Sequence, residues 1–368
     1  MADGKHRILV VAELERVTYS AIVNILRESS EVREWYIVKN IHFPPSLMKR
    51  WKDVFIGIRE IMKEFNPHKI IICGGSLISV WLVVFLTRIS RKKIEIIFYK
   101  NDIENFRLYP SGFRAKIGHF IARATERYCM LAADKIIHKG LYKELEYLAF
   151  YSSIKSKPHY LFREFLEEKN LVPYSTNGKL SSKDKEIHLA YVGGFYIENR
   201  SYHDSILGFC DTVTKHKIHL HIYSEQSSAV EQKLRKLSNQ NKFFHYEGFV
   251  PHDKLMNKIS QYDYGIFGLH RGDRKMEGDR QFIITAFGFK IFDYISAHLP
   301  VICTRDLTAA VEFLEKYNIG LIIDNEEIHK IKIILDNNRK NYLKMIKNID
   351  RAIPHLLNRT DFIDFIIR

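Results

Sequence analysis

The chain has 368 residues, 46% of them hydrophobic, and a formal net charge of +14 at pH 7. A chain of this length and apolar content can bury two ordinary cores, so we expect two domains rather than one. The excess of basic residues indicates an acidic partner, which charge alone leaves open between nucleic acid, an anionic membrane surface and a phosphorylated small molecule.

The cysteines exclude two classes of protein. They lie far apart, without the spacing of metal ligands, and each falls within an apolar helix or strand pattern: Cys73, Cys129, Cys210 and Cys303. We therefore predict reduced core residues of a cytosolic protein, with neither a disulfide framework nor a zinc site, and we predict no metal elsewhere. The N-terminus, MADGKHRILVV, has no apolar stretch long enough for a signal peptide, so we expect none.

The first half of the sequence alternates between short apolar runs and amphipathic segments. Strands are predicted at 7–12, 35–38, 69–73, 94–99 and 135–138, and helices at 18–27, 51–65, 77–89, 112–132 and 141–151. Such alternation predicts a parallel sheet with helices on both faces.

One span in this half, from Ile70 to Ile89, approaches the length of a transmembrane helix. Gly74 and Gly75 interrupt it, and a charged run follows it at 88–93. We therefore predict a buried strand, a glycine turn and an apolar helix, because another strand follows directly and continues the alternation. A single transmembrane helix is the alternative.

The helix predicted at 112–132 has both an apolar and a basic face. Its apolar positions are Phe113, Ile117, Phe120, Ala124, Tyr128 and Leu131. Its basic residues are Arg114, Lys116, Arg123 and Arg127, with Arg107 before them. One interpretation is a core helix with a solvated basic side. The other is contact with an anionic membrane surface, where each basic residue contributes about 1 kcal/mol.

Residues 171–186 lose the apolar period and gather Pro, Ser, Asn, Gly and Lys, which predicts an interdomain linker. The alternation then resumes. Strands are predicted at 187–192, 218–223, 242–246, 264–267 and 320–323, helices at 202–215, 229–239, 253–261 and 309–317, and mostly helix at 326–366. The second half therefore predicts a second parallel sheet.

The stretch from Gly288 to Thr304, GFKIFDYISAHLPVICT, organises this second half. Apolar residues at helical spacing lead to a buried β-branched strand. Lys290 and Asp293 lie three apart on one face of the first helical turn, and the glycine-bearing entry leaves free N–H groups that favour a phosphate. A cation beside a phosphate and a carboxylate for ribose hydroxyls make a nucleotide-binding pair. An ordinary surface ion pair on a buried helix is the alternative.

The pattern K-x-x-D-Y-x-x-A-x-x-P-V-I within this stretch resembles the donor-nucleotide motif of the GT-B retaining glycosyltransferases of the group 1 superfamily. In that superfamily the acidic residue holds the ribose of a nucleotide sugar, which the resemblance assigns to Asp293. Two positions differ from the family pattern. His298 stands where the family usually has glycine, and Thr285 stands where many members carry a glutamate that touches the sugar.

The resemblance implies further donor-site residues in the second half. The loop at Gly193 and Gly194 ends a buried strand and approaches the donor diphosphate in the family, with Arg200 as a basic partner of the phosphates. A solvated loop arginine is the alternative for Arg200. The segment YEGFVPHDKL resembles the part that packs the nucleotide base. The full predicted set that binds the donor is Gly193, Gly194, Phe249, Thr285, Gly288, Phe289 and Asp293, and the predicted catalytic residues are Asp102, Arg200 and Lys290.

Asp102 is the predicted catalytic residue of the first half. It follows the strand of IIFYKNDI, where the family often has a histidine and an aspartate, so that Asn101 replaces the histidine. The resemblance implies that Asp102 positions the acceptor or the transferring sugar. A strand-end aspartate that caps a turn is the alternative.

The sequence thus predicts an α/β protein of GT-B architecture with two Rossmann-like domains, at 1–175 and 176–345, and a C-terminal helix at 346–368 that returns to the first. The resemblance implies transfer of a sugar from a UDP- or GDP-sugar, with retention of configuration and without a metal. We expect no cofactor, a sugar, polysaccharide or lipid-linked acceptor, no nucleic acid, and a cytoplasmic location or a peripheral one on the cytoplasmic membrane face. The alternative is a non-catalytic nucleotide-sugar or nucleic-acid binding protein that kept the fold.

Overall fold

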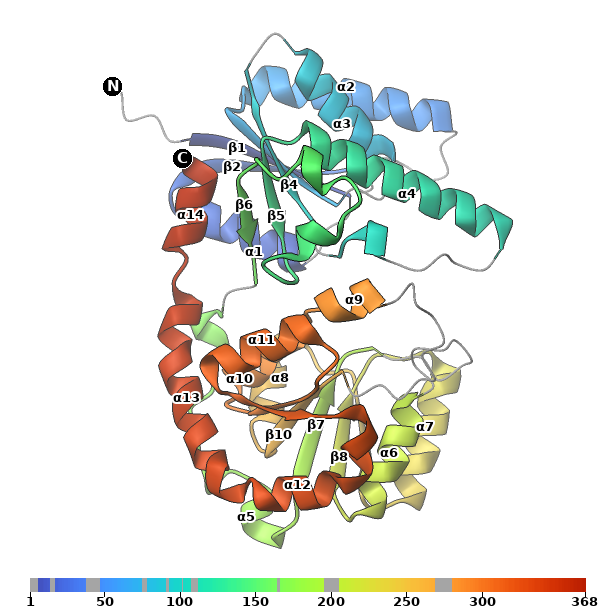
Figure 1. Cartoon of the computed structure of the whole chain (residues 1–368), viewed down its shortest axis with the longest axis vertical. Coiled ribbons are helices and arrows are strands. Elements are labelled where there is room, and N and C mark those ends of the chain that lie inside the picture. The colour runs from blue at the N-terminus through green and yellow to red at the C-terminus, as the bar shows by residue number, and fades with distance from the viewer. Residues whose placement is uncertain are drawn as a thin grey trace. The chain divides into compact units, whose positions relative to one another are not determined.

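The computed structural model describes residues 6–13, 17–37, 47–74, 78–90, 93–100, 102–106, 112–163, 166–194, 205–268 and 280–368. The chain divides into two compact units, each built on a six-stranded parallel sheet (Figure 1). One unit comprises Met1–Glu164, Gly278–Phe282 and Arg359–Arg368, and the other Phe165–Glu277 and Ile283–Asn358. These two parallel sheets with their helices confirm the predicted α/β class with two Rossmann-like domains.

The sheet of the first unit has the strand order β2-β1-β3-β4-β5-β6. Its strands are β1 His6–Ala12, β2 Ser30–Tyr36, β3 Lys69–Cys73, β4 Glu95–Tyr99, β5 Lys135–His138 and β6 His159–Leu161. Its helices are α1 Val17–Arg27, α2 Leu47–Phe65, α3 Ile78–Ile89, α4 Phe113–Ala132 and α14 Thr360–Ile367, with 3-10 turns η1 Glu104–Phe106, η2 Glu144–Tyr147 and η3 Tyr151–Ser153. The span at Ile70–Ile89 is therefore a strand followed by a helix, as predicted.

Alternating side chains on the strands form the core of this unit. Leu9 and Val11 face a cluster that includes Val54 and Ile58 of α2, so α2 and its neighbours α3 and α4 cover one face of the sheet (Figure 1). The C-terminal helix α14 packs beside β5 and β6. The rings of Phe162 and Phe362 lie 4.8 Å apart.

Two predictions for the first unit are wrong, and one strand was missed. The helix predicted at 141–151 is replaced by the short 3-10 turns η2 and η3, because Leu148 is extended and the carboxylate of Glu144 instead accepts the N–H of Gly140. Strand β6 was not predicted, since three residues are too few for a period. Strand β2 begins at Ser30 rather than at 35. Its first half carries charged residues, which an edge strand tolerates, so the apolar pattern did not indicate a strand there.

Helix α4 also corrects an expectation. The residues that it buries are Ala122, Thr125, Glu126, Cys129 and Met130. The predicted apolar face is instead largely in solvent, with exposed fractions of 79% for Phe113 and 69% for Phe120. Arg114 and Lys116 are exposed on the same half of the helix. The interpretation of this face as core is therefore wrong for the N-terminal half of α4.

The sheet of the second unit has the order β12-β11-β10-β7-β8-β9. Its strands are β7 His188–Val192, β8 His219–Tyr223, β9 Phe244–Gly248, β10 Tyr264–Phe267, β11 Val301–Thr304 and β12 Gly320–Ile323. Its helices are α5 Ser181–Asp184, α6 Ser205–Lys215, α7 Ser228–Gln240, α8 His252–Ile259, α10 Lys290–Ser296, α11 Thr308–Tyr317, α12 Ile331–Asn337 and α13 Arg339–Leu357, with the turns η4 Glu168–Asn170 and η6 Asn325–Lys330. Helix α9, Arg280–Thr285, begins in the first unit and ends in the second.

Residues 171–186, predicted as a linker, are bonded to the second unit. The N–H of Val172 donates to the carbonyl of Ser296 at 2.8 Å, and the N–H of Leu180 donates to the carbonyl of Gln261 at 2.9 Å. The stretch therefore lies against the second sheet rather than apart from it.

Among the described residues, every helix is too short or too polar to cross a membrane.

Candidate functional site

The site is built at the carboxyl end of β7, where predicted residues from two distant segments meet. Gly193 follows the strand with φ +113°, and its N–H donates to the carbonyl of Tyr223 at 2.9 Å. A Cβ at Gly193 would lie 3.0 Å from Nζ of Lys290. Glycine therefore allows both the unusual backbone angle and the close approach of an ammonium group.

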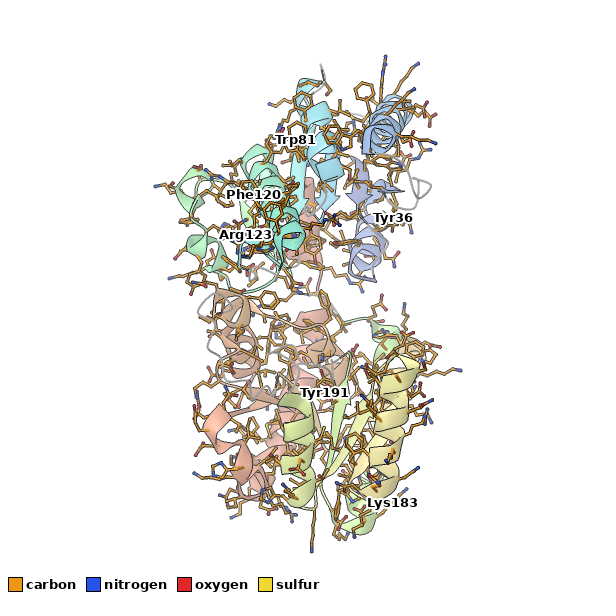
Figure 2. All side chains as sticks on the ribbon, turned by 90° about the vertical axis from the view of Figure 1, so that its right-hand side faces the viewer. Tyr36, Trp81, Phe120, Arg123, Lys183 and Tyr191 are labelled. Atoms are coloured by element: carbon orange, nitrogen blue, oxygen red, sulfur yellow. The ribbon has the colours of Figure 1, made fainter. Side chains whose placement is uncertain are left out.

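Lys290 is held at this position by Tyr191, the strand residue labelled in Figure 2. Its Nζ lies 4.4 Å from the centre of the Tyr191 ring and donates to the Tyr191 hydroxyl at 3.4 Å. Burial lowers the pKa of Lys290 to about 8, and the nearby Asp293 carboxylate only partly offsets this. An anion bound here would stabilise the ammonium form.

Tyr294 fixes the helix that carries Lys290. Its hydroxyl accepts the N–H of Val192 at 3.0 Å and donates to the carbonyl of Ile266 at 2.9 Å. A Cβ at Gly265 would lie 2.3 Å from the Tyr294 ring, so the ring rests directly on β10. Both ends of this bridge are buried, and α10 is therefore positioned by β7 and β10 together.

The entry to α10 differs in part from the prediction. A Cβ at Gly288 would lie 2.3 Å from the Phe267 ring, so glycine is required by packing. The N–H of Ile291 donates to the carbonyl of Gly288 at 3.2 Å, and the N–H of Phe292 to that of Phe289 at 2.8 Å. The expectation that this entry leaves its N–H groups free is therefore wrong for these two, which the turn itself satisfies.

Asp293 has a partner that the sequence reasoning missed. Its Oδ1 lies 2.8 Å from Nε2 of His252, the first residue of α8. This hydrogen bond raises the pKa of His252 above its ordinary value. The side chain of Asp293 is 19% exposed and that of His252 is 56% exposed, so a ligand can reach the pair from solvent. The signal available in the sequence was the histidine within YEGFVPHDKL.

His298, which replaces the family's usual glycine, adopts φ +53°. This left-handed conformation explains why glycine is favoured there. Nε2 of His298 lies 2.9 Å from Oδ1 of Asp350, which holds the histidine in place. His298 thus adopts a left-handed conformation although it carries a side chain.

The remaining predicted donor-site residues of the second unit are placed as follows. Thr285 is buried at the end of α9, Phe249 is 65% exposed after β9, and a Cβ at Gly194 would meet nothing within 4 Å. Phe289 is half-buried before α10. Arg200 lies outside the described residues.

Asp102 lies in the first unit, three residues after β4. Its Oδ1 is 3.1 Å from Nζ of Lys139, a lysine whose side chain is 7% exposed. The aspartate itself is 35% exposed. Its carboxylate is thus oriented by a buried cation, and its side chain is partly exposed.

Residues 204–365 match the family model described as "Glucosyltransferase 3-like, C-terminal domain". The matched part contains Lys290, Asp293 and His252. No curated protein sequence matches the chain at a significant level.

Solved structures share the fold at low identity. Sucrose-phosphate synthase from Thermosynechococcus elongatus is 11% identical with a TM-score of 0.65, over 98% of this chain and 96% of that one. The lipopolysaccharide outer core galactosyltransferase WaaB in its apo form is 12% identical with a TM-score of 0.61, over 97% and 99%. A co-structure of S. aureus MnaA with UDP is 10% identical with a TM-score of 0.55, over 99% and 98%.

At these identities the structural likeness establishes the GT-B fold. The matched family model adds support for a glycosyltransferase, because it covers the segment in which the donor motif was found. The fold and the matched domain both agree with the predicted resemblance to the GT-B glycosyltransferases.

Proposed function

We propose that this protein transfers a sugar from a nucleotide-diphosphate donor, a UDP- or GDP-sugar, to an acceptor hydroxyl. The observation that carries the proposal is the ammonium of Lys290, placed against Gly193 at the end of β7 and on the same helix as Asp293. Open α/β sheets bind ligands beyond the carboxyl ends of their strands. Since one similar structure is a complex with UDP, a uridine nucleotide is the first donor to test.

In this proposal Lys290 neutralises the diphosphate. Its charge stabilises the transition state most strongly, because negative charge collects on the leaving diphosphate as the sugar–phosphate bond breaks. Lys290 therefore contributes to catalysis as well as to binding. Arg200, which the sequence places after the Gly193–Gly194 loop, is proposed as its second cation.

Asp293 is proposed to accept hydrogen bonds from the ribose hydroxyls. It is held now by His252, so the ribose would replace the imidazole as its partner. Asp293 would exchange its hydrogen bond with the imidazole for one from the ribose. The new bond is charge-assisted, because a carboxylate accepts it. Retention of configuration and independence of metal are proposed from the resemblance to the retaining superfamily.

The acceptor is proposed to be lipid-linked or a polysaccharide, and α4 supports the lipid-linked form. Phe113 and Phe120 are exposed on this helix together with Arg114 and Lys116 (Figure 2 labels Phe120). Exposed aromatic rings beside basic side chains suit the interface of an anionic bilayer. We therefore propose that α4 brings the protein to the surface where such an acceptor is found.

A nucleotide screen by thermal shift tests the donor proposal. A nucleotide or nucleotide sugar at about 100 times its Kd adds roughly 2.7 kcal/mol to the stability of the folded protein, so the melting temperature should rise. The shift should persist in EDTA, because no metal is required for binding. If no nucleotide or nucleotide sugar at millimolar concentration moves the transition, the donor proposal fails.

A turnover assay separates an enzyme from a binding protein that kept the fold. The nucleotide sugar that gives the largest shift should be consumed, with release of the nucleoside diphosphate, when acceptors are supplied. Lys290→Ala should reduce this turnover, whereas Lys347→Ala, an exposed lysine on α13, should not. Tight donor binding without release of diphosphate for any acceptor would instead favour the non-catalytic alternative.

A further inference from the structure

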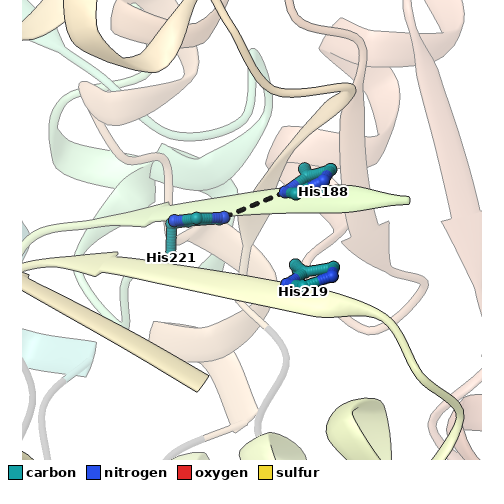
Figure 3. Close-up of side chains that lie close together, drawn as sticks. All are labelled: His188, His219 and His221. Carbon is teal, nitrogen blue, oxygen red and sulfur yellow. Dashed lines mark hydrogen bonds between the residues drawn. The ribbon is translucent and has the colours of Figure 1, made fainter. Parts of the chain in front are cut away.

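One face of the second sheet carries a group of histidines where a parallel sheet normally has aliphatic side chains. His188 of β7 is paired in register with His219 of β8, and His221 of β8 with His245 of β9. The rings of His188 and His219 stack with centres 4.4 Å apart, and those of His221 and His245 with centres 4.3 Å apart. Figure 3 shows three of these rings side by side on β7 and β8.

Each of these three histidines has one ring nitrogen on a carboxylate. Nε2 of His188 lies 2.9 Å from Asp184, and Nδ1 of His221 lies 2.9 Å from Glu247. Nε2 of His219 is bonded to Glu186. An ionised carboxylate can only accept, so in each case the nitrogen that faces it carries the hydrogen. The other nitrogen of each ring then carries a lone pair. In His188 and His221 these nitrogens face each other, and in His219 the nitrogen faces Nε2 of His245.

Proton counting shows that the link between His188 and His221 lacks a hydrogen when both rings are neutral. The chain Asp184–His188–His221–Glu247 has three links, and the central one joins Nδ1 of His188 to Nε2 of His221 at 3.1 Å. Two neutral imidazoles supply two hydrogens, and the two carboxylates take both. Two lone pairs therefore face each other across the central link unless a positive ion lies between them.

The three histidines also have the spacing of metal ligands. One ligand atom from each of His188, His219 and His221 lies within 4.8 Å of the other two. Two nitrogens bound to one tetrahedral Zn²⁺ are about 3.3 Å apart, given Zn–N bonds of 2.0–2.1 Å. The 3.1 Å between Nδ1 of His188 and Nε2 of His221 is close to that value. To bind the same ion, the ring of His219 would have to turn its Nδ1 away from His245.

We propose that His188, His219 and His221 bind one divalent transition-metal ion of the Zn²⁺ type. Imidazole nitrogen is a preferred ligand of such ions, and carboxylates on the far ring nitrogens are the usual outer partners of zinc-bound histidines. His188 and His219 begin their strands, so the metal lies toward the end of the sheet opposite Gly193. Its role is to join β7 to β8, and it does not depend on the proposed transferase activity.

Two further observations support this assignment. Burial lowers the pKa of His188 and of His221, which keeps both imidazoles in the neutral form that binds metals. His219 and Glu186 are half-buried, so an ion can enter from solvent. His245 donates to Nδ1 of His219 at 2.8 Å, and this hydrogen bond would be replaced by the metal bond.

The test is a titration of the full-length protein, freed of metal by chelation, with ZnCl₂ at neutral pH by calorimetry. We expect one saturable site per chain. Glu247→Gln, an exposed change that should leave folding intact, is expected to weaken Zn²⁺ binding at least about tenfold, as losses of outer partners do. His219→Gln is expected to weaken it more. His355→Gln, on the exposed side of α13, is the matched control and should bind like wild type.

Co²⁺ supplies a second readout, because bound tetrahedral Co²⁺ absorbs in the visible. The wild type and His355→Gln should show this absorption and His219→Gln should lose it, with circular dichroism confirming that each variant is folded. Absence of saturable Zn²⁺ binding, or equal affinity in the wild type, Glu247→Gln and His219→Gln, would overturn the proposal. The proposal would also be overturned if the His188–His221 pair still took up a single proton at saturating Zn²⁺.

Discussion

The ammonium of Lys290 lies over the ring of Tyr191, 4.4 Å from its centre, although the two residues are 99 positions apart. The contact holds the end of β7 against the first turn of α10, the two segments from which the donor site is predicted. Burial of the ammonium lowers its pKa to about 8. The principal cation of the site is thus positioned by the sheet.

The first prediction concerns pH. Because the pKa of Lys290 in the free protein is about 8, its ammonium is mostly present at pH 7 and mostly lost at pH 9. Affinity for a nucleoside diphosphate should therefore fall roughly tenfold over that range. Lys290→Arg should remove the fall, because a guanidinium stays protonated. Calorimetric titrations at both pH values check this, and an identical pH profile for the two proteins would contradict it.

The second prediction concerns His252. Its hydrogen bond to Asp293 raises its pKa, so a ribose that takes over Asp293 should return that pKa toward the ordinary value and release a proton near pH 7. Titration of donor in buffers of different ionisation enthalpy measures the release. His252→Ala should bind the donor at least as tightly as wild type and release no such proton. Loss of donor binding in His252→Ala would mean that the histidine holds the ligand itself.

The third prediction concerns the bridge made by Tyr294. Tyr294→Phe leaves the buried N–H of Val192 and the carbonyl of Ile266 without the hydroxyl, which should cost about 1–3 kcal/mol of unfolding free energy. Denaturant unfolding measures the change. Tyr142→Phe, at a tyrosine that is 64% exposed, is the control and should be nearly neutral. Equal stability of the two variants would show that the bridge does not hold α10.

The fourth prediction concerns α4 and membranes. The protein should sediment with anionic vesicles at low salt and be released at high salt, because surface charges are screened. The double variant Arg114→Glu with Lys116→Glu should weaken sedimentation at low salt. The double variant Phe113→Ser with Phe120→Ser should weaken the sedimentation that remains at moderate salt. Lys236→Glu, on the exposed side of α7, should not. Binding that ignores lipid charge and salt alike would refute the interface.

The sequence predicted most of the fold because its periods are local. The helix and strand of the donor motif appear as α10 and β11, since apolar residues at a 3.6 spacing and a β-branched run need no distant partner to be recognised. Contacts between distant segments could not be predicted. The pairing of Asp293 with His252 joins residues 41 apart, and nothing local marks it.

Periodicity also identifies a face without saying what covers it. The apolar positions of α4 are real, but Phe113 and Phe120 face solvent. The histidines of the second sheet were missed for a related reason, because His188 and His219 meet only through strand pairing. The H-x-H of 219–221 was the one local signal, since alternate residues of a strand share a face.

The most direct test of the account is an equilibrium titration of wild type, Asp293→Ala and Lys290→Ala with the nucleotide sugar found in the screen, followed by kcat for each. Asp293→Ala should weaken binding at least about tenfold, because charge-assisted hydrogen bonds contribute roughly 1.5–3 kcal/mol each. Lys290→Ala should lower kcat as well as affinity, since its charge opposes the departing diphosphate. If both variants bind and turn over the donor like wild type, α10 does not hold the nucleotide and the proposed donor site is wrong.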